Sequence, residues 1–507
     1  MTQPFTDYAT TVLDVLSRTP GRTVLTGPDG RHVTAGEFRD AVYRMAGELA
    51  DRGIGRGATV SLLTGNTPGA LGARYAANLA GARVVFLYDG MAPEALARIV
   101  ESTETTALVV DSLRHADAEG LLPLVTVPSV LTLGPAPFGE DLLARSARRA
   151  ARRPEPVVGP DDDYAIRYTG GTTGIPKGIR LAHGSYRRSM DAPRSAMGDP
   201  PRHLACTPLG HLAGMFSDWC LAQGGSVVLL PGFDAGEVLA AIERERITHV
   251  WLVPPLLYRL LDHPDRAATD LSSLSRITYG GAAASATRLR EALDAFGPVL
   301  YGVYGQSETL AIAEVAPQEH TVTGRDGQIT VGRPLPGVEV TIRDGNGALL
   351  PAGRKGEITV RSDGVMRGYW KQPGLTAEVV QDGRVRTGDV GYLDGNGYLY
   401  VVDRIKDMII VVGGHVYPAE LEELLLTHPD VAACVAFGVR GADETEQVHV
   451  AVVPVAGHRI DPGALGAFVA THKGPMYVPG AVHVVEAVPL TTVGKPDRKA
   501  AREQLGL

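Results

Sequence analysis

A glycine- and threonine-rich stretch with a single lysine, YTGGTTGIPKG at residues 168–178, has the residue types that can hold phosphate. Glycines free the backbone to curl so that successive N–H groups converge on one anion, and the threonines add hydroxyl donors. A Walker-type loop would carry Gly directly before the lysine and Ser or Thr directly after it, because that hydroxyl holds magnesium. Here Pro176 precedes Lys177 and Gly178 follows it. The stretch therefore predicts a phosphate-binding loop without a metal ligand of its own.

Three further stretches bring charged or hydroxyl side chains into loop-like contexts. They are YGQSE at residues 304–308, RTGDVGYLD at residues 386–394, and PLTTVGKPDRKA at residues 489–500. Taken singly, each has an ordinary structural interpretation: a solvated glutamate, an aspartate that forms a turn, and a surface lysine. Mg²⁺, however, prefers one or two carboxylates together with phosphate oxygens, so a lone glutamate facing phosphate would suit it. The combination, more than any single motif, indicates phosphate chemistry.

In this order, and over nearly the whole chain, these motifs resemble the adenylate-forming enzymes. That family includes acyl- and aryl-CoA synthetases, the adenylation domains of peptide synthetases, and luciferases, and the chain looks most similar to the acyl- and aryl-CoA ligases. The resemblance implies that the loop binds the β- and γ-phosphates of ATP. ATP is cut at its α-phosphate and pyrophosphate leaves, so the loop has only to hold the departing part. The residues implied in this role are Thr169, Gly170, Gly171, Thr172, Thr173 and Lys177.

The resemblance also implies the remaining nucleotide contacts. Tyr304 would lie against the adenine, Ser307 would offer its hydroxyl to phosphate, and Glu308 would hold the catalytic Mg²⁺. Asp389 would bind the ribose hydroxyls, and Arg404 in VVDRIKD would also reach the ribose. The loop YGGAAAS would line the adenine and acyl pockets, through residues that include Gly281, Ala282 and Ala283.

Three more positions matter for the reaction that the resemblance implies. Lys495 would be the catalytic lysine that enters the site during adenylation. His211 in PLGHLAG would lie near the substrate carboxylate and the pantetheine tunnel, and we interpret it as a pocket-gating residue and not as a general base. Gly413 and Gly414 in GGHVYPAELE would let pantetheine pass over their backbone after the C-terminal domain rotates.

The implied function is ATP- and Mg²⁺-dependent activation of an aryl or medium acyl acid to acyl-AMP, followed by transfer to the thiol of CoA. A carrier-protein thiol is an alternative acceptor, and so is a non-thiol partner, since some family members join nitrite to aryl amines. Thr445 stands where relatives usually have Gly, and HVYP where they often have Asn–Ile–Tyr–Pro, both near the thiol side. From a different class, a non-catalytic nucleotide sensor would keep the fold, but the presence of both Glu308 and Lys495 argues against it.

The elements that must position these residues follow from the apolar patterns. Short apolar segments such as TVSLL (residues 59–63) and RITYGG (276–281) alternate with helical stretches, which is typical of an α/β fold with layered parallel sheets. From about Val331 short strands and tight turns at Asp344-Gly345 and Asp394-Gly395 indicate a β subdomain. We expect an N-terminal domain at residues 1–402 and a small, mobile α+β lid domain at residues 403–507.

Composition and charge narrow the class further. The 507 residues, 44% hydrophobic and 21% charged, fit two or more globular domains. A net charge of −8 gives no support to a nucleic-acid or membrane partner. Cys206, Cys220 and Cys434 form no CxxC pair, which argues against a cysteine-based zinc site. With neither a signal-peptide pattern nor an apolar run long enough for a membrane helix, we expect a cytoplasmic protein.

One basic segment lies outside these motifs. Its arginines fall at helical spacing: Arg145, Arg148, Arg149, Arg152 and Arg153. We interpret them as the solvated face of a helix that leads into a linker, in preference to a phosphate- or membrane-binding stripe.

Overall fold

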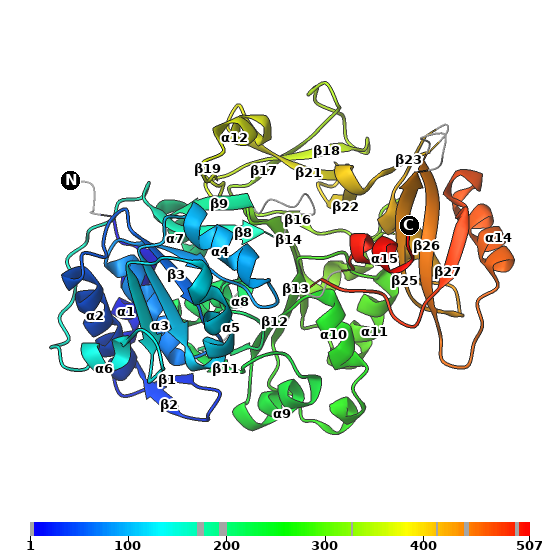
Figure 1. Cartoon of the computed structure of the whole chain (residues 1–507). Helices are drawn as coiled ribbons and strands as arrows, with labels where there is room; N and C mark the ends of the chain where they lie inside the picture. Colours follow the sequence, from blue (N-terminus) through cyan, green and yellow to red (C-terminus); the bar gives the residue numbers. More distant parts are fainter. Residues whose placement is uncertain are drawn as a thin grey trace.

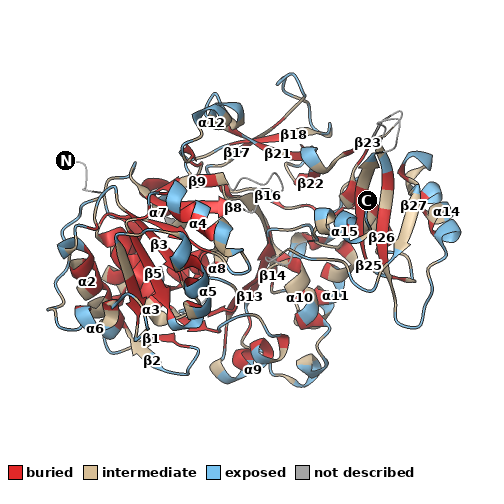
Figure 2. Cartoon of the chain, in the orientation of Figure 1, coloured by how far each residue is buried: buried red, intermediate tan, exposed pale blue. Residues whose placement is uncertain are grey.

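The computed structural model of the chain describes residues 5–169, 177–191, 200–325, 328–411, 414–440, 446–491 and 496–507. Figure 1 shows a large body that holds most of the elements, and a smaller body on one side that begins near β23. Figure 2 shows that buried residues concentrate on the central strands of the large body, whereas its outer helices are exposed on one face. The predicted α/β architecture, with a large N-terminal and a small C-terminal part, is confirmed.

The first sheet of the large body has the strand order β19-β9-β8-β4-β3-β5-β6-β7. Its strands from β4 to β7 run parallel, as the continuous apolar segments predict, and β9 returns antiparallel to β8. The strands are β3 (Thr59–Leu63), β4 (Arg83–Phe86), β5 (Ala107–Asp111), β6 (Ser129–Leu133), β7 (Glu140–Asp141), β8 (Asp163–Thr169), β9 (Lys177–Ala182) and β19 (Gly368–Tyr369).

The second sheet has the order β16-β15-β14-β13-β12-β10-β11-β1-β2. Its middle strands are parallel, and β15 forms an antiparallel hairpin with β14. The strands are β1 (Thr23–Thr26), β2 (His32–Thr34), β10 (Arg202–Ala205), β11 (Ser226–Leu229), β12 (His249–Leu252), β13 (Arg276–Gly280), β14 (Leu300–Gln306), β15 (Leu310–Val315) and β16 (Arg333–Pro334).

One apolar core joins the two sheets. It combines strand residues of the first sheet, such as Ile179, with strand residues of the second, such as Trp251, and with Met215 and Phe216 of α8. The helices of the large body are α1 (Tyr8–Leu16), α2 (Ala35–Asp51), α3 (Pro68–Leu79), α4 (Pro93–Ser102), α5 (His115–Leu121), α6 (Leu142–Ser146), α7 (His183–Asp191), α8 (Leu212–Ala222), α9 (Ala235–Glu245), α10 (Pro254–Leu261), α11 (Ala286–Phe296) and α12 (Pro373–Val379). A capping box of Thr34 and Glu37 begins α2.

The predicted β subdomain is a separate sheet that contains β17 (Glu339–Arg343), β18 (Gly356–Arg361), β20 (Val380–Gln381), β21 (Arg384–Leu393) and β22 (Leu399–Arg404). Both predicted Asp-Gly turns exist, but the residues with positive φ are the second glycines, Gly347 and Gly397. The aspartates accept backbone N–H bonds from residues two and four positions on, so the turns are wider than two-residue turns.

The C-terminal part consists of β23 (Ile409–Val411), β24 (Gly414–Val416), α13 (Pro418–Leu425), β25 (Val431–Arg440), β26 (Glu446–Pro454), α14 (Pro462–Lys473), β27 (Ala481–Val484) and α15 (Arg498–Gln504). Its strands and helices enclose apolar clusters made only of residues after 408. The proposed domain boundary after residue 402 falls inside β22, which continues to Arg404.

The arginine-rich segment differs from our interpretation. Helix α6 ends at Ser146, so most of these arginines do not lie on a helix. Arg145, Arg149 and Arg153 form ion pairs with Glu140, Asp51 and Asp14, respectively. They therefore fasten the segment to α2, β7 and α1, and spacing alone could not reveal those partners.

The part of the chain that the structure describes holds no helix of the length and hydropathy that crossing a membrane requires.

Candidate active site

The ends of several parallel strands meet at one edge of the second sheet. Strands β10, β12, β13 and β14 pair in parallel, so the loops after them emerge on the same side. His211 follows β10, Gly281 follows β13, and Ser307 and Glu308 follow β14. In open α/β sheets, ligands bind in the crevice outside these carboxyl ends. The fold thus gathers residues that lie about a hundred positions apart in the sequence.

Glu308 lies in the turn of the β14–β15 hairpin and is held from two directions. Its backbone carbonyl accepts a bond from Met366 N at 2.8 Å, and its Oε1 accepts a bond from the Tyr369 hydroxyl at 3.0 Å. The Tyr369 ring centre lies 5.6 Å from Nζ of Lys177. Burial, together with the adjacent Glu308 carboxylate, raises the pKa of Tyr369, which therefore keeps the proton it donates. Tyr369 thus links the predicted metal carboxylate to the predicted phosphate lysine.

Asp389 is the centre of a second cluster. Strands β21 and β22 place Asp389 directly opposite Arg404, whose Nε lies 3.0 Å from Oδ1. The Tyr304 hydroxyl donates to Oδ2 at 2.7 Å. Behind it, the Asp389 N–H donates to the Thr387 hydroxyl, which in turn donates to the Ile358 carbonyl. Three residues predicted from separate motifs are therefore in direct contact.

The electrostatics of this cluster fit a carboxylate that acts as an acceptor. Only 4% of Asp389 is exposed. Burial, followed by the charge of Asp389, raises the pKa of Tyr304 well above its ordinary value, so the phenol stays protonated and donates. In this structure the Tyr304 hydroxyl is hydrogen-bonded to Asp389. The stacking of its ring on adenine stays a prediction.

The loop after β13 turns away sharply. A Cβ on Gly280 would lie 2.2 Å from the Val303 carbonyl oxygen, so only glycine allows β13 and β14 to approach there. Gly281 has φ +76° and is exposed, and Ala283 is exposed as well, while Ala282 is half-buried. The loop therefore presents backbone and small side chains at the edge of the sheet.

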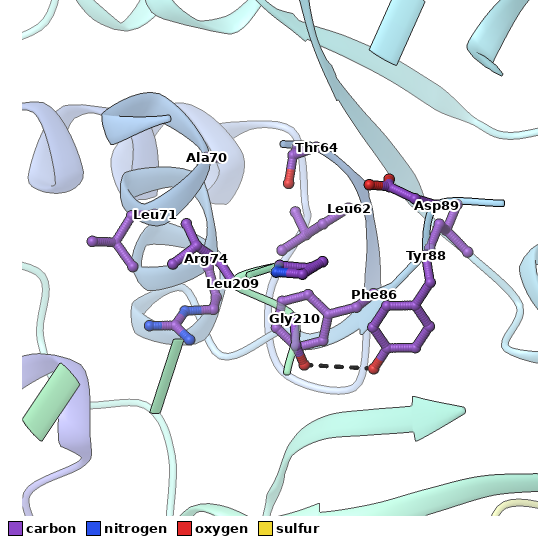
Figure 3. Close-up of a pocket in the computed structure, with 12 residues that line it drawn as sticks. Leu62, Thr64, Ala70, Leu71, Arg74, Phe86, Tyr88, Asp89, Leu209 and Gly210 are labelled. Atoms are coloured by element: carbon purple, nitrogen blue, oxygen red, sulfur yellow. Dashed lines mark hydrogen bonds between the residues drawn. The ribbon is translucent and has the colours of Figure 1, made fainter. Parts of the chain in front are cut away.

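His211 caps the N-terminus of α8 with its backbone and stacks its ring on Tyr88, with ring centres 4.1 Å apart and planes at 10°. Figure 3 shows Phe86 and Tyr88 facing Leu209 and Gly210, and marks the 3.5 Å contact between the Tyr88 hydroxyl and the Gly210 carbonyl. The cavity there has a volume of about 20 Å³, room for roughly one water molecule. The predicted gating role of His211 stays a prediction.

Several predicted residues lie outside the described residues: Gly170, Gly171, Thr172, Thr173, Gly413 and Lys495. Thr169 ends β8 and Gly414 begins β24. The roles predicted for all of these residues stay predictions.

Sequence reasoning missed Tyr369, Thr387 and Tyr88. Tyr369 lies in a two-residue strand, and only its pairing with β9 brings it near Lys177. Thr387 sits within the TGD segment, which was a usable signal. Tyr88 ends the apolar RVVFLY run, where nothing distinguishes it from a core residue.

Comparisons with known proteins agree over the whole chain. The family model for AMP-binding enzymes matches residues 13–370, and the model for their C-terminal domain matches residues 420–495. A medium/long-chain fatty acid–CoA ligase, FadD8, of Mycobacterium tuberculosis is 35% identical over 97% of this chain and 89% of its own length. A feruloyl-CoA synthase of an Amycolatopsis species is 34% identical over 94% of this chain and 95% of its own.

Among solved structures, the amide bond synthetase McbA from Marinactinospora thermotolerans superimposes with a TM-score of 0.90 at 40% sequence identity. The match covers 98% of this chain and 99% of that one.

Proposed function

Because the chain belongs to the family of AMP-binding, adenylate-forming enzymes, we propose that it uses ATP to convert an aryl or medium-chain acid into an acyl adenylate and then transfers the acyl group to the thiol of CoA. The observation that carries the first step is the pair of clusters at one crevice. Glu308, Tyr369 and Lys177 form one, and Tyr304, Asp389 and Arg404 form the other. A polyphosphate needs the first kind of surface and a ribose needs the second.

In the first half-reaction, a carboxylate oxygen of the acid attacks the α-phosphorus of ATP. An O–P bond forms, the bond from the α-phosphorus to the bridging oxygen breaks, and pyrophosphate leaves with the electron pair. Negative charge grows on the α-phosphate and leaving oxygens, so fixed positive groups stabilise this transition state most. Lys177 and the glycine-rich loop hold the leaving group, and Lys495 approaches from the C-terminal part.

The Glu308 carboxylate suits Mg²⁺ on the chemistry of its donors. It is half-buried in a turn, and among the described residues only its Oε1 is hydrogen-bonded, by the Tyr369 hydroxyl. One carboxylate oxygen completed by ATP phosphates and water is the coordination that Mg²⁺ prefers. When bound, the ion supplies positive charge next to the phosphates. Tyr369 holds the carboxylate in position for it, and the buried Asp389 orients the ribose.

In the second half-reaction, the thiol sulfur attacks the acyl carbon and a C–S bond forms. The bond from the acyl carbon to the phosphate oxygen breaks, AMP leaves with the electron pair, and the thiol proton is released. The proposed lid, residues 403–507, would rotate between the two steps, removing Lys495 and presenting Gly413 and Gly414 to pantetheine. This rotation also keeps water from the mixed anhydride.

An amine is a second candidate acceptor, favoured by one observation. The solved structure described as an amide bond synthetase is 40% identical to this chain over nearly the full length of both. Attack of an amine nitrogen on the same acyl carbon would release AMP and a proton and leave an amide. The nucleotide clusters serve either outcome equally.

The test measures pyrophosphate release with ATP and Mg²⁺ over aryl acids, medium-chain acids and amino acids, and over aryl amines with nitrite. Each acid arm is repeated with CoA, with a carrier-protein thiol and with a simple amine, and the products are identified by mass. We expect acid-dependent pyrophosphate release and a CoA thioester. Absence of acid-dependent release over the whole panel would overturn the proposed first step.

The acceptor is tested separately with Gly414→Leu. If pantetheine crosses this backbone, the added side chain blocks thioester formation and leaves acyl-AMP formation intact. If the acceptor is an amine or nitrite, the variant keeps its overall activity. Full thioester turnover in the variant would contradict the pantetheine passage.

A further inference from the structure

One buried arginine of the large body pairs with no carboxylate among the residues that the structure describes. Among the described residues, the buried arginines are Arg74, Arg114, Arg167 and Arg276. Three of them form ion pairs, with Asp218, Asp117 and Glu314, respectively. Arg167 is 6% exposed, yet its Nε and one terminal nitrogen find neither a carboxylate nor a hydrogen-bond acceptor in the part of the chain that the structure describes. A buried charge is costly unless it is paired, so this guanidinium calls for an anion from outside the chain.

The strand register shows which way Arg167 faces. In β8 it pairs with Ile179 of β9, and its neighbour Ala165 pairs with Leu181. Ile179, Ala165 and Leu181 all belong to the core between the two sheets, whereas Ile166 and Tyr168 belong to the cluster on the other side. Because side chains alternate along a strand, Arg167 points into the space between the sheets.

That space adjoins the His211 loop. The parallel pairing of β4 with β8 continues from Val84–Ala165 and Val85–Ile166, which sets Phe86 beside Arg167. Phe86 and Tyr88 face Gly210, and Tyr88 stacks on His211 (Figure 3). Burial raises the pKa of Tyr88 to about 12, and the positive charge of Arg167 opposes this rise. Arg167 therefore lies on the side of β8 that faces the predicted gate.

Arg167 is also close to the phosphate loop along the chain. Thr169, where β8 ends, is two residues further on, which is about 7 Å along a strand. Arg167 is therefore close along the strand to the predicted phosphate loop, and its side chain is on the face of β8 that is turned toward the predicted gate. Under the proposed function, an acid that reaches the α-phosphate approaches this end of β8.

We propose that Arg167 binds a carboxylate of the acid substrate in the space between the two sheets. This inference rests on the proposed function, because it names the group by which the acid is recognised. A guanidinium is planar and presents parallel donors that match a carboxylate in a two-point bond. The substrate carboxylate would pair with Arg167 as Asp218 pairs with Arg74 and Glu314 pairs with Arg276.

The bound carboxylate is either the one that becomes adenylated or a second one on a diacid. Benzoate against terephthalate, and hexanoate against adipate, distinguish these sources. If the reacting carboxylate is held, Arg167→Met raises the KM of all four acids by at least tenfold. If a distal carboxylate is held, the variant raises the KM of the two diacids only. In both cases the KM of ATP stays within about twofold, and Arg167→Lys retains part of the binding.

Thermal stability separates this role from a structural one. Removing an unpaired buried charge relieves a cost, so Arg167→Met should unfold at the same or a higher temperature than the unchanged protein. The matched variant Arg276→Met removes a buried arginine that does have a carboxylate partner. It should lower the melting temperature and leave the KM of the acids unchanged.

Calorimetric titration of the same four acids, without turnover, keeps the inference testable if no acid supports pyrophosphate release. Weaker binding of an acid to Arg167→Met than to the unchanged protein supports it. Equal binding of every acid to the two proteins, no binding to either, or a lowered melting temperature with unchanged KM would overturn it. Pyrophosphate release by the unchanged protein reports separately on the proposed function.

Discussion

Two buried carboxylates of this protein each contact a tyrosine hydroxyl and a cation, but they connect different parts of the molecule. Asp389, 4% exposed, lies between the Tyr304 hydroxyl and Arg404. Glu420, 6% exposed, accepts from the Tyr477 hydroxyl at 2.6 Å and from Nζ of Lys355 at 2.6 Å and of Lys473 at 3.5 Å. The Asp389 cluster joins strands within the large body. The Glu420 cluster joins α13 of the C-terminal part to Lys355, next to β18 of the β subdomain.

The difference shows that a tyrosine, a carboxylate and a cation do not by themselves define a site. Asp389 stands at an edge where ligand-facing loops converge, so its cluster is a candidate ribose site. Glu420 and Lys355 lie on opposite sides of the segment that would act as a hinge, so their contact fastens the two parts. If the part of the chain after β22 rotates, this contact breaks, and the Asp389 cluster, whose Arg404 ends β22, stays whole. The predictions that follow distinguish the two clusters by how strongly substitutions should change the reaction, ATP binding or stability.

The largest effect is expected from Lys495→Ala, in the part of the chain that the Glu420 cluster fastens. This lysine would act mainly on the charge of the transition state, so its loss should slow acyl-AMP formation by about 10²–10³-fold. ATP affinity should be little changed. Single-turnover pyrophosphate release and equilibrium ATP binding measure the two quantities. Near-normal adenylation in the variant would remove Lys495 from the mechanism.

Asp389→Ala should raise the KM of ATP by about 10–100-fold, since the hydrogen bonds that its carboxylate would accept from ribose hydroxyls contribute to ground state and transition state alike. Lys355→Met, which removes a cation of the Glu420 cluster, is the control and should leave this KM unchanged. Initial rates over a range of ATP concentrations provide the test. A collapsed kcat beside an unchanged KM in Asp389→Ala would assign Asp389 another role.

Lys355→Met should loosen the C-terminal part. The lysine is 33% exposed, so the pair is worth about 0.5–1 kcal/mol, and its loss should increase the open population about two- to fivefold. Lys473→Met is the matched control, because Lys473 and Glu420 both belong to the C-terminal part. The rate of proteolysis between β22 and β23 reports the opening. Equal cleavage rates in the two variants would show that the contact of Lys355 with Glu420 does not hold the C-terminal part against the β subdomain.

The smallest effect concerns pH at the same interface. Burial raises the pKa of Glu423, on α13, to about 7. Between its ordinary pKa and about 7 the folded protein binds more protons here than the unfolded chain, so this group lowers stability as pH rises through that window. Glu423→Gln should therefore raise the melting temperature at pH 8 by about 1–3 °C and have little effect at pH 4.5. An equal shift at both pH values would contradict the titration.

Much of the fold was predictable from the sequence, for identifiable reasons. The apolar strand segments and the Asp-Gly turns depend on local chemistry, so they formed where predicted. The helix expected through Arg153 did not form, because Arg149 and Arg153 are held by Asp51 and Asp14 from distant helices. Positive φ fell on Gly347 and Gly397 because the preceding aspartates close wider turns.

The sequence by itself determined the types of groups in the candidate nucleotide site. The order of the motifs and their resemblance to those of adenylate-forming enzymes pointed to Tyr304, Asp389 and Arg404. Only the tertiary structure decided that these three touch one another, that Tyr369 links Glu308 to Lys177, and that Arg167 is buried with no carboxylate partner among the described residues. The physical reason is that contact and burial arise where strands distant in sequence pair and pack. A single sequence records the chemistry of each residue but not which residues lie opposite it.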